Sequence, residues 1–379
     1  MGEAKDPLEI LDGGRMDAAR RSARRFTKTD PDLSNLIEGL FDRLGEARIE
    51  IKDLVGARGV DHRKVREAIF GLSNLKPVPP EWIISPSKSK HSPGVPTLFA
   101  SDWHWGEIVD PEQINGVNQF NLKIAHRRAK TLVERTIDLL KSHMVHPDYP
   151  GIVFALGGDM VSGDIHDELR DTNELASIPT VLDLLEVLVA CVRSLADAFG
   201  KVHIPAVTGN HGRLTVKMRA KGRHHTSWDW LLYCLLEREL KGDKRVSFQV
   251  SNGPDCSYSV FGHKFCLTHG DQFRGGDGQI GFLGPVIRGD LRKRSRNQQV
   301  DMSYDTMLLG HWHQYCHTRK IISNGSLKGY CEFANQNNFG FEVPQQALFL
   351  NHPKHGVTFA FPVLLEDHPR KSDKWVEYA

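Results

Sequence analysis

Paired cysteines and long hydrophobic runs are missing from this sequence. Its 379 residues include 6 cysteines, none in a C-x-x-C pair, which excludes a zinc ribbon and a dense disulfide framework and favours reduced, buried thiols. No apolar run is long enough to span a bilayer, and the charged start, Met1-Gly2-Glu3-Ala4-Lys5-Asp6, is not followed by the apolar segment of a secretory signal. These absences predict a cytoplasmic protein with no membrane contact.

The sequence also lacks an excess of charge of one sign. Its formal net charge is +2, so any preference for an anionic partner has to come from local clusters of charge. The hydrophobic content of 40% is ordinary for a globular protein. A chain of this length can form one large domain and a smaller appendage.

The first 76 residues divide into a leader and a small helical module. Residues 1–30 are polar and arginine-rich, which is typical of a basic, poorly ordered leader. Residues 31–76 have apolar side chains at helical spacing around a Gly59-Val60 turn, which predicts an all-α, helix-turn-helix-like module. Its second helix carries the cations His62, Arg63, Lys64 and Arg66. They could contact DNA phosphates, but a small helical adaptor with ordinary surface charge fits the same pattern.

The rest of the chain reads as one α/β domain. Residues 77–95 are rich in proline, serine and lysine and predict a linker. Residues 96–366 alternate β-rich runs with amphipathic stretches, including helices expected at 122–142 and 174–199. Residues 367–379 form a polar tail to which we assign no function.

Five polar motifs in this domain each follow a predicted strand. They are Ser101-Asp102-Trp103-His104, Gly157-Gly158-Asp159, Thr208-Gly209-Asn210-His211, Thr268-His269-Gly270-Asp271 and Gly310-His311-Trp312-His313. Because the carboxyl ends of strands in an open α/β sheet border a crevice, we expect these motifs to meet there. A lone histidine is more often structural, but five strand-end motifs with imidazole, carboxylate and amide donors predict a metal site.

In their order along the chain, D-x-H, G-D, G-N-H, H and G-H-x-H resemble the signature of calcineurin-like metallophosphoesterases. The resemblance covers about residues 96–330, and the Asn324-Gly325-Ser326 turn is similar to the small-residue turn that follows the last motif in that family. It implies an α/β fold, a four-layer αββα sandwich, with a dimetal centre where the two sheets meet.

The resemblance also implies a role for each motif. One divalent metal ion would be bound by Asp102, His104 and His313, and a second by Asn210, His269 and His311, with Asp159 bridging both. His211 would remain unliganded and assist catalysis near the scissile phosphate. Two cations about 3.5–4 Å apart can generate a bridging hydroxide for in-line attack on phosphorus. We expect Mn²⁺, with Fe, Zn²⁺ and Mg²⁺ as alternatives.

One departure from the family pattern concerns the residues after His211. The family often has Glu or Asp there, whereas this chain has Gly212-Arg213. What orients His211 is therefore left open, and Arg213 is a candidate phosphate clamp.

Two basic clusters bear on the substrate. The substrate-binding candidates are Arg213, Lys217, Arg219, Lys221 and Arg223 in the first cluster, and Arg292, Lys293 and Arg294 in the second. Cations beside a dimetal site suit a polyanionic strand through counterion release, although solvated surface loops would have the same composition. A polar loop, residues 162–168, is a further candidate substrate contact.

The sequence thus predicts a two-metal phosphodiester hydrolase acting on DNA, a nuclease that resembles the double-strand-break-repair branch and the metallophosphoesterases of phages and prophages. A phosphomonoesterase or small-nucleotide phosphohydrolase is the first alternative, because the fold alone does not select the substrate. A non-catalytic DNA-binding scaffold is the second. Whether two chains form a homodimer is left open.

Overall fold

The computed structural model describes residues 39, 42, 79–85, 94–275 and 281–367. The predicted leader, almost all of the helix-turn-helix-like module and the tail from residue 368 lie outside these residues. Within the described part, no helix combines the length and the apolar character needed to cross a membrane.

Six strands form the larger of two sheets. They are β1 (Val95–Ala100), β2 (Ile152–Leu156), β3 (Val202–Ala206), β4 (Val246–Val250), β10 (Gln345–His352) and β11 (Gly356–Leu364). Their order is β11-β10-β1-β2-β3-β4. Strands β1 to β4 are parallel, and β10 pairs antiparallel with β1. The carboxyl ends of β1, β2 and β3 therefore share one edge of the sheet.

Five strands form the smaller sheet. They are β5 (Asp255–Val260), β6 (His263–Thr268), β7 (Thr306–Leu309), β8 (Cys316–His317) and β9 (Ile321–Ser323). Their order is β5-β6-β7-β9-β8, with β6, β7 and β9 parallel. The residues that follow β6 and β7 are thereby brought next to each other as well.

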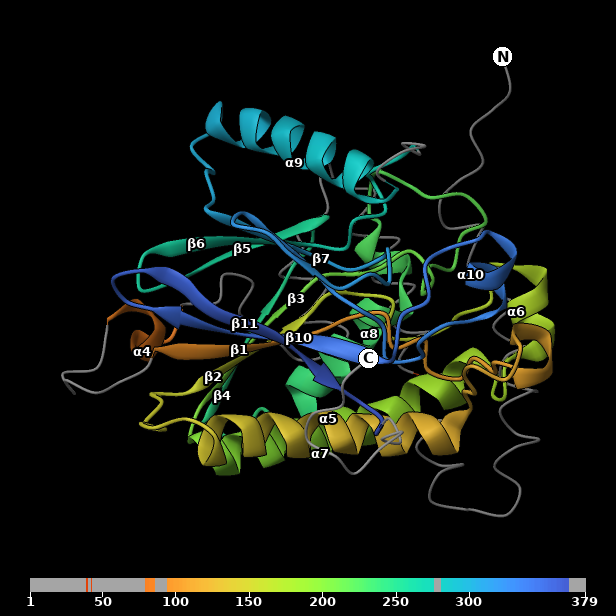
Figure 1. Ribbon diagram of the computed structural model, residues 1–379, viewed down its shortest axis with the longest axis horizontal. Helices are drawn as coiled ribbons and strands as arrows, with labels where there is room; N and C mark the ends of the chain where they lie inside the picture. The colour runs from red at the N-terminus through yellow and green to blue at the C-terminus, as the bar shows by residue number, and fades with distance from the viewer. Residues whose placement is uncertain (1–38, 40–41, 43–78, 86–93, 276–280, 368–379) are drawn as a thin grey trace, which may run out of the picture.

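Helices cover the outer faces of the two sheets (Figure 1). α5 (Leu122–Ser142), α7 (Ser177–Phe199) and α8 (Trp228–Glu239) pack against the larger sheet, and α9 (Leu283–Gln298) lies over the smaller one. The predicted helices at 122–142 and 174–199 correspond to α5 and α7. Short helical turns complete the described elements: α4 (Glu81–Ile84), η2 (Pro111–Ile114), α6 (Asp167–Thr172), η3 (His224–Thr226) and α10 (Glu332–Gln336).

Alternation along β1 explains how its sheet is buried on both faces. Successive side chains of a strand point to opposite faces. Leu98 packs in the core shared with the helices, whereas Phe99 packs between the two sheets with Phe265 and Phe349. A third core, which includes Val286, joins α9 to the smaller sheet. The protein is therefore a mixed α/β structure with two sheets and helices, as the sequence predicts.

Part of the predicted linker is packed against the domain. Ile83, within α4, is fully buried, and its carbonyl accepts a 2.7 Å hydrogen bond from the Phe261 amide. Trp82 lies against Gly151 so closely that a Cβ atom on this glycine would meet the indole ring at 2.8 Å. An apolar pair within a polar, proline-rich stretch thus forms a contact with the domain.

Candidate metal centre

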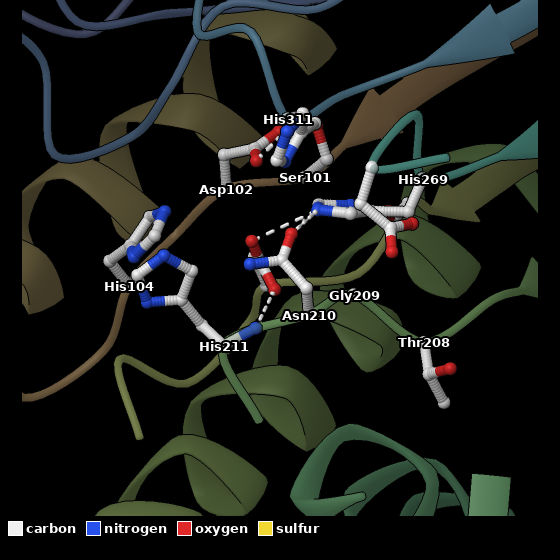
Figure 2. A network of polar contacts seen from close by, with 12 residues as sticks. Ser101, Asp102, His104, Thr208, Gly209, Asn210, His211, His269 and His311 are labelled. Carbon is white, nitrogen blue, oxygen red and sulfur yellow. Dashed lines mark hydrogen bonds and ion pairs between the residues drawn. The ribbon is translucent and has the colours of Figure 1, made fainter. Parts of the chain in front are cut away.

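The five polar motifs lie at the strand ends, as the sequence predicts. Asp102 and His104 follow β1, Asp159 follows β2, and Asn210 follows β3 in the larger sheet. The smaller sheet contributes His269 after β6, and His311 and His313 after β7. Figure 2 shows side chains from both sheets pointing toward a common centre.

The donor atoms form three overlapping groups, each of which could hold a metal ion. Asp102, His104 and His313 each offer an atom within 4.8 Å of the others. In this group His313 Nε2 lies 3.1 Å from His104 Nε2 and 3.4 Å from Asp102 Oδ1.

The second group contains Asp159, His269 and His311, whose donor atoms are equally close. His269 Nε2 lies 2.9 Å from Asp159 Oδ2 and 3.1 Å from Asn210 Oδ1. A third group of neighbouring donor atoms belongs to Asp159, His104 and His211. Its carboxylate therefore lies between the two ligand sets, where a bridging ligand would have to be.

These residues fit divalent cations. Asp102 and Asp159 are almost completely buried, and buried carboxylates require a compensating charge. Burial would lower the pKa of His269, but the neighbouring Asp159 carboxylate raises it to about 10. The point where imidazole, carboxylate and amide oxygens meet therefore attracts positive charge. Mixed nitrogen and oxygen donors of this kind accept Mn²⁺, Fe or Zn²⁺.

The orientation of the imidazoles also suits metal binding. His269 Nδ1 lies 2.9 Å from the Gly157 carbonyl, which can only accept a hydrogen bond, so this nitrogen is the donor and Nε2 faces the site. Burial lowers the pKa of His311 to about 4. This imidazole is therefore neutral near pH 7, which is the form that binds metals.

Five of the seven predicted ligands have left-handed backbone conformations. Only nine non-glycine residues in the described part of the chain have positive φ angles. The five ligands and their φ angles are Asp102 (56°), His104 (47°), Asp159 (50°), His311 (70°) and His313 (52°). Each such conformation costs about 1–3 kcal/mol and persists where the surrounding structure enforces it, often at functional sites.

Two glycines allow these loops to approach one another. A Cβ atom on Gly209 would lie 2.0 Å from Asp159 Oδ1, and one on Gly310 would lie 2.2 Å from Asp102 Oδ2. No side chain could be accommodated at either position without displacing a predicted ligand.

Asp229, at the start of α8, was not predicted to be part of the site. Its buried carboxylate accepts hydrogen bonds from the amides of Asp159 (3.0 Å), Gly209 (2.8 Å) and Met160 (3.2 Å). It therefore joins the loops that follow β2 and β3. The available signal was a carboxylate between two tryptophans, Trp228 and Trp230, at the start of an otherwise apolar run that ends at Leu236.

The Asp102 loop is supported by residues near the end of the domain. Gln346 Oε1 accepts hydrogen bonds from the Ser101 amide (2.9 Å) and the Trp103 indole (3.2 Å). Asn324 Nδ2 donates to Ser101 Oγ (3.0 Å), which donates in turn to Asp102 Oδ2 (2.5 Å). The Asn324 turn thus orients a predicted ligand through Ser101.

The structure indicates what orients His211. Its amide donates to Asp159 Oδ1 (2.6 Å), and its ring Nδ1 donates to the Ser162 carbonyl (3.1 Å). Its ring lies 4.5 Å from that of His104 (Figure 2). Arg213 donates to the carbonyls of Asn210 (2.7 Å) and Thr215 (3.1 Å), so it stabilises its own loop. The Ser162 carbonyl and the Asp159 carboxylate thus orient His211.

In the first basic cluster, one further arginine has an internal partner. Arg223 pairs with Asp271 (2.7 Å) and donates to the Gly209 carbonyl (2.8 Å). Lys217 and Lys221 are exposed, and Arg219 is partly exposed.

The second basic cluster lies on α9, which was not predicted as a helix. Lys293 is buried and pairs with Asp255 (2.5 Å), Arg294 pairs with Asp290 (2.7 Å), and Arg292 is exposed. Counting Arg213 and Arg223, four of the eight predicted substrate-binding cations have internal partners. All eight remain predictions as substrate contacts.

Comparisons with known proteins assign no family to this chain. No protein-family model matches it, and no curated protein matches its sequence. Among solved structures it is similar to a putative 5'-nucleotidase from Staphylococcus aureus in complex with alpha-ketoglutarate, with a TM-score of 0.31 and 11% sequence identity. The match covers 73% of this chain and 55% of that one, so the chain spans about half the length of that protein. A similarity this low carries no conclusion about fold or function.

Proposed function

We propose that this chain is a two-metal phosphoester hydrolase with the four-layer αββα architecture of calcineurin-like metallophosphoesterases. One observation carries the proposal: seven predicted ligands from five motifs converge, and the Asp159 carboxylate lies close to His104 as well as to His269 and His311. The stacking of the layers supports it. The helices α5 and α7 cover one face of the larger sheet, the smaller sheet packs on its other face, and α9 covers the smaller sheet (Figure 1).

The protein's own residues would bind and orient the reacting groups. Asp102, His104 and His313 would hold one metal ion, Asn210, His269 and His311 the other, and Asp159 both. Two bound divalent cations supply water activation and polarisation of the phosphoryl group. Because ligands from both sheets converge, the substrate phosphate would bind between the strand ends.

His211 would assist departure of the leaving oxygen. With Nδ1–H donated to the Ser162 carbonyl, Nε2 is the ring nitrogen left for the substrate. Burial lowers the pKa of His211, and the Asp159 carboxylate opposes that effect. When protonated, the imidazole would donate its Nε2 proton to the leaving oxygen.

DNA is the substrate that we propose first. Exposed Lys217 and Lys221 follow the G-N-H motif within about ten residues, and Arg292 is exposed on α9. Each phosphate neutralised by such a cation releases counterions and strengthens the binding of a polyanionic strand.

A small-nucleotide phosphohydrolase or phosphomonoesterase is the second candidate, and a specific observation favours it. Arg213, Arg223, Lys293 and Arg294 are engaged within the protein, which leaves fewer cations for a long polyanion. A non-catalytic scaffold is less well supported, because all seven predicted ligands are present and converge.

One assay separates these activities. The full chain, reconstituted with Mn²⁺, Mg²⁺, Zn²⁺ or Fe²⁺, is incubated with labelled single- and double-stranded DNA, a small phosphodiester and a small phosphomonoester. We expect DNA cleavage that depends on metal and is lost in the Asp159→Asn variant. Intact DNA together with rapid hydrolysis of the phosphomonoester would establish the second candidate, and no hydrolysis of any substrate would contradict both.

A further inference from the structure

A buried ion pair lies directly behind one predicted metal ligand. Lys328 Nζ is 2.6 Å from Glu107 Oε1, and the two side chains are only 5% and 7% exposed. The other carboxylate oxygen, Glu107 Oε2, lies 3.2 Å from His104 Nδ1. Removing two charges from water costs several kcal/mol for each ion, and their attraction offsets this cost only when the geometry is good. No role in the proposed hydrolysis accounts for this pair so far.

The pair is held in place from several sides. Arg128, which is fully buried, donates to the carbonyls of Lys328 (2.6 Å) and Leu327 (3.0 Å). Asn118 also donates to the Lys328 carbonyl (2.8 Å). The Glu107 amide donates to the His104 carbonyl (3.1 Å), which joins the backbone of the two residues. These contacts hold the backbone segments from which the Glu107 and Lys328 side chains extend.

The carboxylate lies on the Nδ1 side of the His104 ring. Glu107 Oε2 and His104 Nδ1 are 3.2 Å apart, and neither atom has a hydrogen-bond partner in the described part of the chain. Because an ionised carboxylate carries no proton of its own, its charge favours the proton of the imidazole on Nδ1. Nε2 is then left as the lone-pair nitrogen, and it faces His313 at 3.1 Å within the first ligand group. Histidine ligands of metals are commonly oriented by a carboxylate in this manner.

Lys328 compensates the charge of the buried carboxylate. Its Nζ lies 2.6 Å from Glu107 Oε1, and without such a partner a buried carboxylate would be strongly unfavourable. The other carboxylate oxygen is thereby left to face His104 Nδ1. An imidazole with its proton on Nδ1 presents the Nε2 lone pair to a metal.

The two ligand groups differ in the group that faces Nδ1 of a predicted histidine ligand. His104 is oriented by a carboxylate, whereas His269 is oriented by a backbone carbonyl. A carboxylate partner raises the basicity of the ligand more than a neutral carbonyl does. The geometry points to Glu107 and Lys328 as positioning residues that hold His104 in the neutral Nδ1–H tautomer and strengthen metal binding by the Asp102, His104 and His313 group. The metal part of this inference rests on the proposed function.

The first test measures metal affinity. Titration calorimetry with Mn²⁺ on the metal-depleted full chain compares wild type with Glu107→Gln and Lys328→Met. We expect about 10–100-fold weaker binding at one site and unchanged binding at the other. Asp255→Asn is the matched control, because it breaks another carboxylate–lysine pair, between the partly buried Asp255 and the buried Lys293, that contacts no predicted ligand. Equal weakening of both sites, or no weakening, would overturn the inference.

The second test needs no metal. Nitrogen-15 NMR of histidine-labelled, metal-depleted protein reports the tautomer of His104, assigned by comparison with a His104→Gln variant. We expect the Nδ1–H form in wild type and in Asp255→Asn, and a mixture of tautomers in Glu107→Gln. The double variant Glu107→Gln/Lys328→Met carries no buried net charge, so it separates loss of the fold from loss of orientation. If wild type binds no Mn²⁺, the proposed function is wrong. If Glu107→Gln leaves the tautomer unchanged, the positioning role is wrong.

Discussion

Replacing Gly209 with alanine tests whether the close approach of two loops builds the metal centre. The added Cβ atom would lie 2.0 Å from Asp159 Oδ1 and 2.2 Å from the Asp159 amide nitrogen. Contacts between non-bonded heavy atoms are optimal at about 3.5–4.0 Å. Since one of the neighbours is backbone, rotation of a side chain cannot relieve the overlap. Either the G-N-H loop or the Asp159 loop has to move by about 1 Å or more.

The expected cost follows from what such a shift disturbs. It lengthens the hydrogen bonds from the Gly209 amide to Asp229 (2.8 Å) and from the His211 amide to Asp159 (2.6 Å). Overpacking of this kind typically costs about 1–3 kcal/mol of folding free energy. A displacement of about 1 Å in a catalytic group can cost about 100-fold in rate. We therefore expect a modest loss of stability and a large loss of hydrolysis.

The measurements are urea denaturation and steady-state hydrolysis of whichever phosphoester the wild type cleaves. Gly242→Ala is the matched control, because a Cβ atom there meets nothing within 4 Å and its φ angle is not in the left-handed region. This variant should keep both wild-type stability and wild-type activity. Full activity in Gly209→Ala would refute the idea that the contact between these loops positions Asp159 and His211.

Three further predictions concern the site and its surroundings. His211→Ala should lower kcat by about 100–10,000-fold with unchanged metal content by elemental analysis; a loss of metal would instead make His211 a ligand. Removal of metal by a chelator should lower the midpoint of thermal unfolding. Mn²⁺ added at 100 times its Kd should then raise the free energy of unfolding by about 2.7 kcal/mol; no change would argue against a metal site. Burial raises the pKa of Glu342 from 4.5 to about 7. The protonated carboxyl therefore contributes to the free energy of unfolding below pH 4.5, and this contribution is lost as the pH rises through 7. Relative to Glu342→Gln, wild type should therefore gain stability in urea titrations between pH 8 and pH 5; a constant difference would contradict the raised pKa.

The strand ends and their motifs could be predicted because their signals are local. An apolar run followed by a polar motif marks the end of a strand, and parallel pairing then aligns neighbouring ends. The register of β1 and β2, with Ala100 opposite Leu156, places Asp102 and Asp159 just beyond the same edge. This is why short patterns sufficed to locate the predicted ligands.

The residues that support the ligands could not be found in this way. Glu107 and Lys328 are 221 positions apart, and Asp229 lies 70 positions from the Asp159 amide that it binds. No periodicity links such residues, because only the tertiary fold brings them together. The basic clusters have a similar limit: composition counts the charge of Lys293 but does not reveal that this side chain pairs with Asp255.

The antiparallel strand β10 has a consequence for how the protein is made. It occupies the edge of β1, and its residue Gln346 holds Ser101 and Trp103, which precede it by 245 and 243 positions. During synthesis on the ribosome, the Asp102 loop therefore emerges long before its support exists. Shorter nascent chains can already contain all seven predicted ligands but lack the strand that orients the first of them. On the proposed function, metal uptake is accordingly expected among the last events in the maturation of this protein.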